Sequence, residues 1–364
     1  MAITDTAALT EEYATLTEHC GLVDRSERGK LALTGSGGVE FLNGQVTNEL
    51  VGLAPGEGRY AAFLTHKGKM LGDLRILAVS DDPNAEPSKD AEPSELLLDT
   101  ERVALQALFD MIRRFKVGYD VELHKRTLEY SLFSLIGPTA GEVATRAFLL
   151  QASSPSSSQA SNERVDVSNG ALPYAREGCL PEAEHDHLLL RLGDTPARLI
   201  RTDLGFDVLF EADAADALRA ALVDAGAVEV SEDTLEIVRV ESGRPRYGLD
   251  LDETTIPQEA ALNERAVSFT KGCYVGQETV ARLHYKGKPN RYLRGLRLSE
   301  SVEPGAELRL GERSVGRLGS SVLSPVFGPI GLALVRREAE PGATLEAGGQ
   351  GVHATVTELP FKPI

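Results

Sequence analysis

The residue with the clearest capacity for chemistry is Cys273, within the stretch SFTKGCYVGQETVAR of residues 268–282. A cysteine becomes reactive when a nearby cation or a helix amino terminus favours its thiolate. Lys271 lies two positions earlier, and a helix is expected to begin just after Gly276. Gly272 and Gly276 would also permit a tight turn or the close approach of a ligand. The alternative is that Cys273 is a small buried hydrophobic residue.

The remaining cysteines do not indicate a disulfide framework or a metal site. Cys20 and Cys179 are far from Cys273 in the sequence, and the total is odd. One thiolate and the distant His284 do not form a tetrahedral ligand set, so no tightly bound metal is predicted. The alternating His185 and His187 are interpreted as surface or packing residues.

Positive charge is concentrated beyond the cysteine. Between residues 271 and 297, Glu278 is the one acid, and the cations are Lys271, Arg282, Lys286, Lys288, Arg291, Arg294 and Arg297. This segment is either a candidate anion site or an ordinary solvated surface. The whole chain carries 55 acids against 38 Lys and Arg, with a net charge of −17, so an extensive nucleic-acid surface is not expected.

The elements that must position these residues follow an α+β pattern. Strands are predicted at 30–35 and on both sides of a Lys-Gly turn within 60–79, with helices at 37–50 and 101–115. Ser231 is a candidate N-cap of a further helix that stops at Gly243. The Pro- and Ser-rich segments 81–95 and 151–163 are interpreted as mobile loops.

From Arg291 the chain consists of short alternating runs punctuated by Gly and Pro, which predicts a small antiparallel barrel. We therefore expect a body of residues 1–288 and a barrel domain of residues 289–364. No apolar run reaches the roughly 18 residues needed to span a membrane, and the amino terminus is acidic. These features favour a cytoplasmic protein with no membrane association.

The motif around Cys273 resembles the signature of the YgfZ family of folate-binding proteins, which includes mitochondrial iron-sulfur assembly factors. The match is unbroken from Lys271 to Glu278, and its other members are Gly272, Tyr274, Gly276 and Gln277. The segments GLVDRSERGKLALTGSGGVEFLNGQVTNEL, RVESGRPRYG and GRLGSSVLSPVFGPIGLALV resemble the wider glycine-cleavage T-protein superfamily. The resemblance implies interleaved α+β subdomains around a central folate pocket, closed by a C-terminal antiparallel β-barrel.

Three departures from the transferases of that superfamily bear on activity. Gly72 stands where one of two paired aspartates would be, which leaves Asp73 alone. The segment RTDLGFDVLF keeps Asp207 as a shortened acid. Cys273 replaces the acid of a Lys-Gly-Asp-Phe-x-Gly run. The folate pocket is therefore expected to be kept, whereas the acids of the transfer reaction are incomplete.

Position-for-position similarity implies a set of folate contacts: Tyr60, Asp73, Asp207, Arg239 and Glu241. Two residues apart on a helix, Arg239 and Glu241 point to nearly opposite sides. We expect one of them to contact the ligand and the other to hold the helix in place. The alternatives are that Tyr60 is a wall residue of the core and that Asp73 caps a turn.

Two functions follow as hypotheses. The first is an accessory protein for iron-sulfur cluster assembly or repair, with tetrahydrofolate or a related reduced folate in the pocket and Cys273 as the functional thiol. Its partners would be assembly proteins or cluster-containing client enzymes, and the family is linked to enzymes that modify tRNA. Persulfide handling, transient cluster ligation and a redox step all remain open for the thiol.

The second hypothesis is a tetrahydrofolate-dependent aminomethyltransferase or demethylase-type enzyme, with Asp73 as the acid that orients or activates the reacting amine. A third is a scaffold that binds no ligand. Titration with a reduced folate would separate the third hypothesis from the other two.

Overall fold

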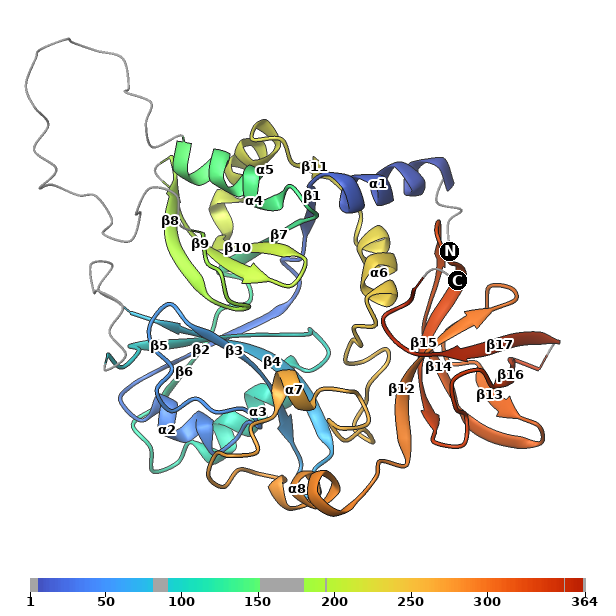
Figure 1. Ribbon diagram of the computed structural model, residues 1–364. Coiled ribbons are helices and arrows are strands. Elements are labelled where there is room, and N and C mark those ends of the chain that lie inside the picture. The colour runs from blue at the N-terminus through green and yellow to red at the C-terminus, as the bar shows by residue number, and fades with distance from the viewer. Residues whose placement is uncertain (1–5, 81–90, 151–179, 194, 350, 363–364) are drawn as a thin grey trace, which may run out of the picture.

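The computed structural model describes residues 6–80, 91–150, 180–193, 195–349 and 351–362. The described chain forms two β-sheets, one above the other, and a β-barrel beside them (Figure 1). Of the two predicted loops, residues 81–90 and 151–163 lie outside the described ranges, as does Cys179. The mixture of helices with largely antiparallel sheets confirms the predicted α+β class.

The two sheets are interleaved along the chain. The first sheet has the strand order β11 (Val228–Glu229), β1 (Gly21–Asp24), β7 (Tyr130–Ile136), β10 (Gly205–Glu211), β9 (Thr195–Thr202) and β8 (His187–Leu192). The second sheet has the order β3 (Gly58–Leu64), β4 (Met70–Val79), β5 (Glu95–Thr100), β2 (Gly29–Thr34) and β6 (Glu122–Lys125). All these neighbours pair antiparallel except β1 and β11.

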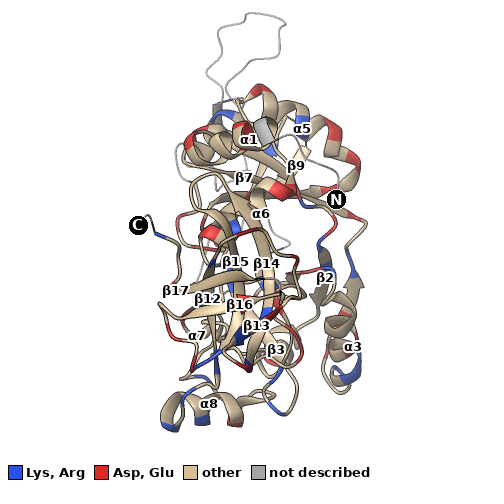
Figure 2. Cartoon of the chain, turned by 90° about the vertical axis from the view of Figure 1, so that its right-hand side faces the viewer, with Lys and Arg blue, Asp and Glu red and all other residues tan. Residues whose placement is uncertain are grey.

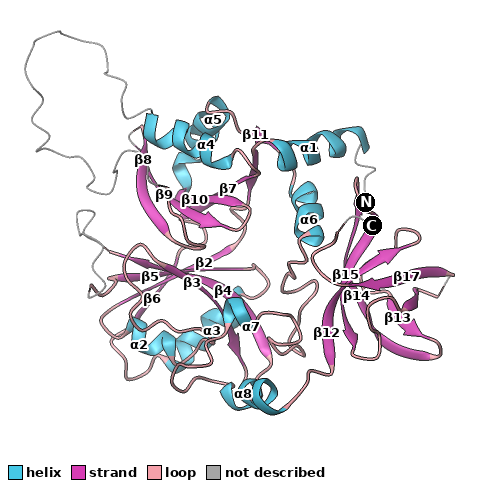
Figure 3. Ribbon diagram, in the orientation of Figure 1, coloured by secondary structure: helices cyan, strands magenta, loops and turns pink. Residues whose placement is uncertain are grey.

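Each sheet has helices on its outer face (Figure 3). The first sheet packs against α4 (Ala140–Ala144) and α5 (Ala215–Asp224), and a π-helical turn (Thr145–Leu150) continues α4. A short 3-10 turn (Ala212–Ala214) leads into α5. The second sheet packs against α2 (Gly38–Asn43) and α3 (Leu105–Phe115). Both outer faces are apolar, and each forms its own core.

The inner faces of the two sheets are apolar at one end of their strands and polar at the other. At one end they meet in an apolar cluster that includes Leu77, Leu97, Leu132 and Leu209. At the other end the residues two to four positions away along the same strands are buried and polar: Asp73, Arg75, Asp99, Ser134 and Asp207. Because side chains alternate between faces with a period of two, these residues share the inner face with the leucines. Polar groups are therefore gathered between the sheets.

The carboxy-terminal strands close into an antiparallel barrel, as predicted. Its order is β12 (Arg291–Leu298), β15 (Gly328–Arg336), β14 (Arg313–Ser324), β13 (Glu307–Leu310), β16 (Thr344–Ala347) and β17 (Val352–Thr357). Strand β16 lies between Gly342 and Gly348, and its four residues are too few to show an alternating pattern in the sequence.

Four further helices connect these units. Between the first sheet and the barrel lie α1 (Thr6–Glu18) and α6 (Glu232–Glu241) (Figure 1). The predicted N-cap of α6 is confirmed, because the Ser231 side chain accepts a hydrogen bond from the Thr234 backbone nitrogen at 3.3 Å. Helices α7 (Asn263–Ala266) and α8 (Gln277–Lys286) lie beside the second sheet.

The helix predicted over 37–50 is shorter than expected. Helix α2 ends at Asn43, and Gly44 follows as its C-cap. Glycine is a poor helix former, and the residues after it leave the helix to pair across other segments. Thr47, for example, donates a hydrogen bond from its side chain to the carbonyl of Ala266 at 2.5 Å.

Candidate functional site

A central cavity lies at the polar end of the space between the two sheets. It encloses about 200 Å³ and is lined by both sheets, by α6 and by the segment that follows α6. Four of the predicted folate contacts, Tyr60, Asp73, Asp207 and Arg239, line it together. Glu241 is not among its lining residues in the described chain. The structure thus brings together side chains that are up to 179 residues apart in sequence.

A chain of ion pairs crosses the cavity wall from the first sheet to the second. Asp207 accepts hydrogen bonds from Ser134 Oγ and from Arg75, both at 2.6 Å. Arg75 also pairs with Asp99 at 2.8 Å, and Asp99 pairs with Arg28 at 2.8 Å. Burial opposes ionisation of Asp99, but these two arginines lower its pKa to about 2. Asp99 is therefore held as a carboxylate, and the carboxyl oxygens of Asp99 and Asp207 already have partners.

The network continues toward the barrel. Arg246 pairs with Glu101 at 3.0 Å and with Glu236 at 2.9 Å. Arg239 pairs with Glu236 at 2.7 Å and with Asp250 at 2.9 Å. Such buried charges resist displacement because removing one member leaves its partner unpaired.

Asp73 differs from the other acids of the cavity. Its carboxylate accepts a hydrogen bond from the Tyr60 hydroxyl at 2.7 Å, and no ion pair to it is found among the described residues. Burial raises the pKa of Asp73 to about 6. Asp73 can therefore hold or release a proton near neutral pH, as a general acid or a ligand-binding group requires. It does not cap a turn, because it lies inside strand β4.

His185 is a cavity residue that sequence reasoning missed. Its backbone has φ 75°, a left-handed conformation that is uncommon for a side chain other than glycine. Burial lowers the pKa of the imidazole to about 3, so the ring is neutral. Its ring centroid lies 6.2 Å from that of Tyr60, and its Nδ1 atom is buried without a hydrogen-bond partner in the described structure. The one sequence signal was the unusual His-Asp-His spacing ahead of a strand.

Arg239 and Glu241 face different surroundings, as their spacing predicted. Arg239 lines the cavity, whereas the Glu241 side chain accepts hydrogen bonds from Tyr13 of α1 at 2.9 Å and from Ser324 of β14 at 2.5 Å. Glu241 therefore connects helix α6 to α1 and to the barrel.

The Cys273 motif lies outside the central cavity. Its residues 271–276 form a loop before α8, and the Cys273 side chain is exposed. Lys271 is buried, and its Nζ donates to the carbonyls of Asn43, Val46 and Asn48 at 2.6–3.0 Å. Burial lowers the pKa of Lys271 to about 8. Lys271 therefore anchors the loop to the end of α2. The sequence alone indicates only that this lysine is a cation near the thiol.

The second glycine of the motif has a packing role. Gly276 has φ +85°, and a Cβ atom there would lie 2.6 Å from the Thr65 carbonyl oxygen. Its neighbour across this contact is Gly68, in the turn between β3 and β4, which also has positive φ. Tyr274 is buried in the apolar cluster that also contains Leu64 and Met70, at the turn end of that hairpin. The Cys273 loop is thus fitted to the turn of the β3–β4 hairpin.

The cavity and the Cys273 loop sit at different points of one hairpin. Tyr60 of β3 borders the cavity, and Leu64, where the turn begins, borders the loop. At about 3.3 Å per residue, the two points are separated by roughly 13 Å along the strand. Gln277 and Glu278 begin helix α8 on the far side of the loop, where Glu278 is exposed.

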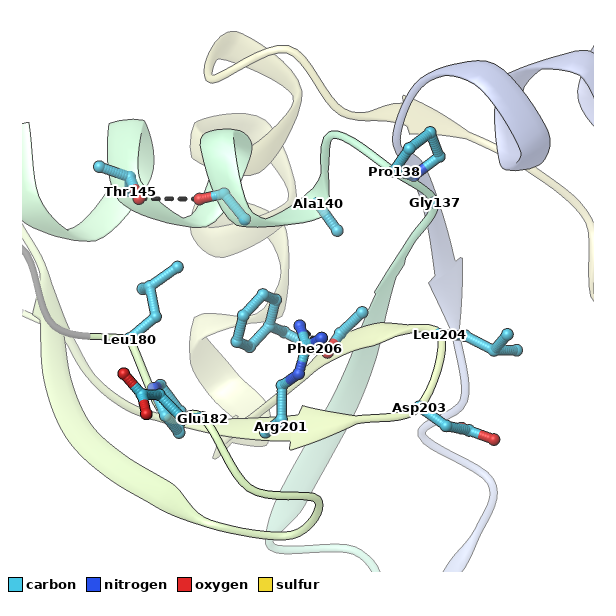
Figure 4. A pocket seen from close by; sticks show the side chains of 13 residues that line it. Gly137, Pro138, Ala140, Thr145, Leu180, Glu182, Arg201, Asp203, Leu204 and Phe206 are labelled. Carbon is cyan, nitrogen blue, oxygen red and sulfur yellow. Dashed lines mark hydrogen bonds between the residues drawn. The ribbon is translucent and has the colours of Figure 1, made fainter.

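A second cavity lies between α4 and the β9–β10 hairpin (Figure 4). It measures about 810 Å³ and is open at the surface. Two of its polar side chains have local partners: Thr145 Oγ1 donates to the Gly141 carbonyl at 2.8 Å, and the Arg201 guanidinium lies over the Phe206 ring at 4.8 Å. We place the candidate site in the central cavity, where the charged side chains converge.

In the described part of the chain, no helix is both long and apolar enough to cross a membrane. Nor do the described residues include a group of three or more His, Cys, Asp or Glu side chains arranged to hold a metal ion.

The interleaved sheets, the ionic cavity between them and the appended barrel define a T-protein-like member of the aminomethyltransferase superfamily. The family model of the GCVT N-terminal domain matches residues 4–271, and the chain belongs to that family. The model of the CAF17 C-terminal β-barrel domain matches residues 291–360. This combination confirms the CAF17/YgfZ-type resemblance seen in the sequence.

Similar proteins support the same assignment. A putative chloroplastic transferase of Arabidopsis thaliana is 26% identical over 343 residues, covering 93% of this chain and 71% of that protein. An aminomethyltransferase of Thermotoga petrophila is 28% identical over 362 residues, covering 96% and 88%. The crystal structure of the glycine cleavage system aminomethyltransferase T from Bartonella henselae has a TM-score of 0.75 at 21% identity, covering 97% of this chain and 89% of that one. The similarity to the Bartonella henselae structure shows a shared fold.

Proposed function

We propose that this protein is a folate-binding accessory factor for iron-sulfur cluster assembly or repair. A reduced folate would occupy the central cavity, and Cys273 would act as the functional thiol, with assembly proteins or cluster-containing enzymes as partners. The observation that carries the proposal is the exposed Cys273, held by a buried lysine and a glycine contact on the same hairpin that lines the cavity.

The side chains of the cavity fit a folate. A pterin ring needs aromatic or apolar walls and hydrogen-bonding groups at its edge. Tyr60 and Tyr247 offer rings, and Asp73 offers a carboxyl group that is not used in an ion pair. The Nδ1 atom of His185 and the Nε atom of Arg265 are buried without partners at the cavity. Buried polar atoms usually have hydrogen bonds, so these two are available to a ligand.

Titration calorimetry with 5-formyltetrahydrofolate tests the folate part of the proposal. We expect saturable binding to the wild-type protein and weaker binding to the Tyr60→Phe variant, which loses the hydroxyl bonded to Asp73. The Glu278→Gln variant is a control, since Glu278 is an exposed residue outside the cavity. Absence of binding to the wild type would contradict the folate assignment.

Genetic complementation tests the thiol. In cells lacking the native gene, we expect the Cys273→Ala variant to fold normally, because the side chain is exposed, and to fail to restore the activities of cluster-dependent enzymes. Gly272→Ala serves as a control in the same loop, since nothing lies within 4 Å of a Cβ atom there. Full restoration by Cys273→Ala would remove the thiol from the mechanism.

A one-carbon transfer activity is the second candidate function. The retained Asp73, with its pKa raised to about 6, favours it, and so do relatives named as aminomethyltransferases. Against it stands Gly72, where a Cβ atom would lie 2.6 Å from the Phe63 ring, so an aspartate could not be accommodated without repacking. Folate-dependent turnover of a lipoyl-carried aminomethyl group or of a methylated amine by the purified protein would support this function over the first.

A further inference from the structure

A basic surface forms where helix α8 meets the turn between β3 and β4. The turn contributes His66 and Lys67, and the helix and the residues after it contribute Arg282, Lys286 and Lys288. All five side chains are exposed, and none forms an ion pair with a described residue. We call these five residues the α8 basic surface. Figure 2 shows Lys and Arg at this end of the molecule around α8.

The geometry brings these residues to one side. Thr279 of α8 contacts the turn, because a Cβ atom on Gly68 would lie 2.7 Å from the Thr279 Cβ. Arg282 and Lys286 follow Thr279 by three and seven positions, and such positions share one face of a helix. The two cations of the helix therefore lie on the face that meets Lys67. The Cys273 loop adjoins this region, because the loop ends at Gly276, which packs on Gly68 of the turn.

The other cations of this stretch of sequence have partners. Arg291 pairs with Glu259 at 2.8 Å, Lys271 is buried against backbone carbonyls, and Arg297 donates to the carbonyl of Lys362 at 2.6 Å. Arg294 is half-buried and lies over the Tyr292 ring at 5.1 Å. Between residues 271 and 297, the exposed cations without an ion pair to a described residue therefore all belong to the α8 basic surface. In a chain with a net charge of −17, exposed cations without partners are well suited to an anionic partner.

The partner fits an acidic protein surface better than a nucleic acid. The rings of Phe269 and His284 stack on each other with centroids 3.7 Å apart, so those two faces are closed to a base. Nucleic-acid strands also extend well beyond a patch of four Lys and Arg side chains, and the negative charge of the rest of the chain would repel them. At physiological salt, repulsion by the acidic remainder of the chain is screened beyond about 8–10 Å. A compact acidic patch on a partner can therefore bind the α8 basic surface without approaching that acidic remainder.

We propose that the α8 basic surface docks an acidic face of a partner protein and so places that partner against the exposed Cys273 loop. Tyr285 is 67% exposed at the same helix end and supplies an apolar contact at the surface. This docking does not depend on whether a folate occupies the central cavity.

Fluorescence anisotropy with a labelled 20-residue oligoglutamate peptide tests the proposal. The probe variant is Lys67→Glu/Arg282→Glu/Lys286→Glu. The matched control is Arg102→Glu/Arg114→Glu/Lys125→Glu, which makes the same change in net charge at exposed cations near α3, away from α8 (Figure 2). All six side chains are exposed, and thermal unfolding should show that both variants remain folded.

We expect binding to the wild type that weakens with added salt, a loss of about 10-fold or more in the probe variant, and a change of less than about 3-fold in the control. Equal losses in the two variants would overturn the proposal, because net charge alone would then explain binding. Tighter binding of a 20-nucleotide single-stranded RNA than of the peptide, lost in the probe variant, would also overturn it and make the surface a nucleic-acid site.

Discussion

The acids of the central cavity have different properties because their neighbours differ. Asp207 and Asp99 share arginines, whereas Asp73 has the Tyr60 hydroxyl and no arginine in direct contact among the described residues. Burial is common to all three. An acid that is buried without a cation keeps its proton to higher pH. Asp73 can therefore change its protonation state near neutral pH, whereas the pKa of Asp99 is lowered to about 2.

This difference predicts a pH dependence of stability. The pKa of Asp73 is about 6 in the folded chain, against 3.8 for an ordinary aspartate. Because the folded state binds this proton more tightly, its contribution to stability is lost as pH rises from about 4 through about 6. The Asp73→Asn variant should gain stability over the wild type across this window, on the order of 2–3 kcal/mol. Thermal unfolding of both proteins at several pH values checks this, and a constant difference would contradict it.

Replacing His185 should change ligand affinity without a large change in the stability of the fold. Asn tolerates the left-handed backbone, so His185→Asn should keep the local fold while losing the ring beside Tyr60. We expect affinity for 5-formyltetrahydrofolate to fall by about 10-fold, the value of one hydrogen bond in a buried site. Calorimetry measures the affinity and thermal unfolding the stability. Unchanged affinity, with the wild type still binding, would show that His185 has only a structural role.

At the scale of elements, the β3–β4 hairpin links the two candidate functional regions. Its strands carry Tyr60 and Asp73 to the cavity, and its turn receives the Cys273 loop. The turn is matched to the loop by two glycines with positive φ, Gly68 and Gly276. Gly276 of the motif is therefore explained by backbone packing against the turn.

The two glycines of the motif make a matched pair of variants. A side chain at Gly276 meets both the Thr65 carbonyl and a positive φ, so Gly276→Ala should destabilise the protein by about 2 kcal/mol or more. Gly272→Ala should cost little, because the space around a Cβ atom there is open. Urea unfolding of the two variants measures the difference. Similar stabilities would show that the loop can move away from the turn.

At the scale of the whole molecule, the barrel is joined to the body by a shared apolar cluster and by polar contacts of helix α6. Arg239 of α6 reaches Asp250, and Asp250 accepts a hydrogen bond from the backbone of Ser320 in the barrel at 2.8 Å. Glu241 joins the same helix to Ser324. Helix α6 thereby holds the barrel against the body while its other side borders the cavity.

Because Glu241 and Arg239 have different roles within α6, we expect their variants to differ in ligand affinity. Glu241→Ala loses hydrogen bonds to Tyr13 and Ser324, so we expect it to lower stability by about 1–3 kcal/mol and to leave affinity for 5-formyltetrahydrofolate unchanged. Arg239→Ala should lower both, since Arg239 lines the cavity. Thermal unfolding and calorimetry together distinguish them, and a larger loss of affinity in Glu241→Ala would refute the assignment.

The sequence by itself determined the kinds of elements and their order. Local patterns of two and 3.6 residues and the N-cap at Ser231 predicted strands β2, β3 and β4 of the second sheet, helix α6 and most of the barrel. The resemblance also named four side chains that do share one cavity. These features are local or are preserved in linear motifs, so they can be read without coordinates.

Only the tertiary structure decided which residues surround each functional group. His185 reaches Tyr60, and Lys271 reaches carbonyls more than 220 residues away, through contacts that no local pattern encodes. The separation of Cys273 from the cavity was equally invisible, because it depends on where along one hairpin each segment packs. Burial and charge partners are set by chain packing, and they control the protonation of Asp73 and the exposure of the thiol.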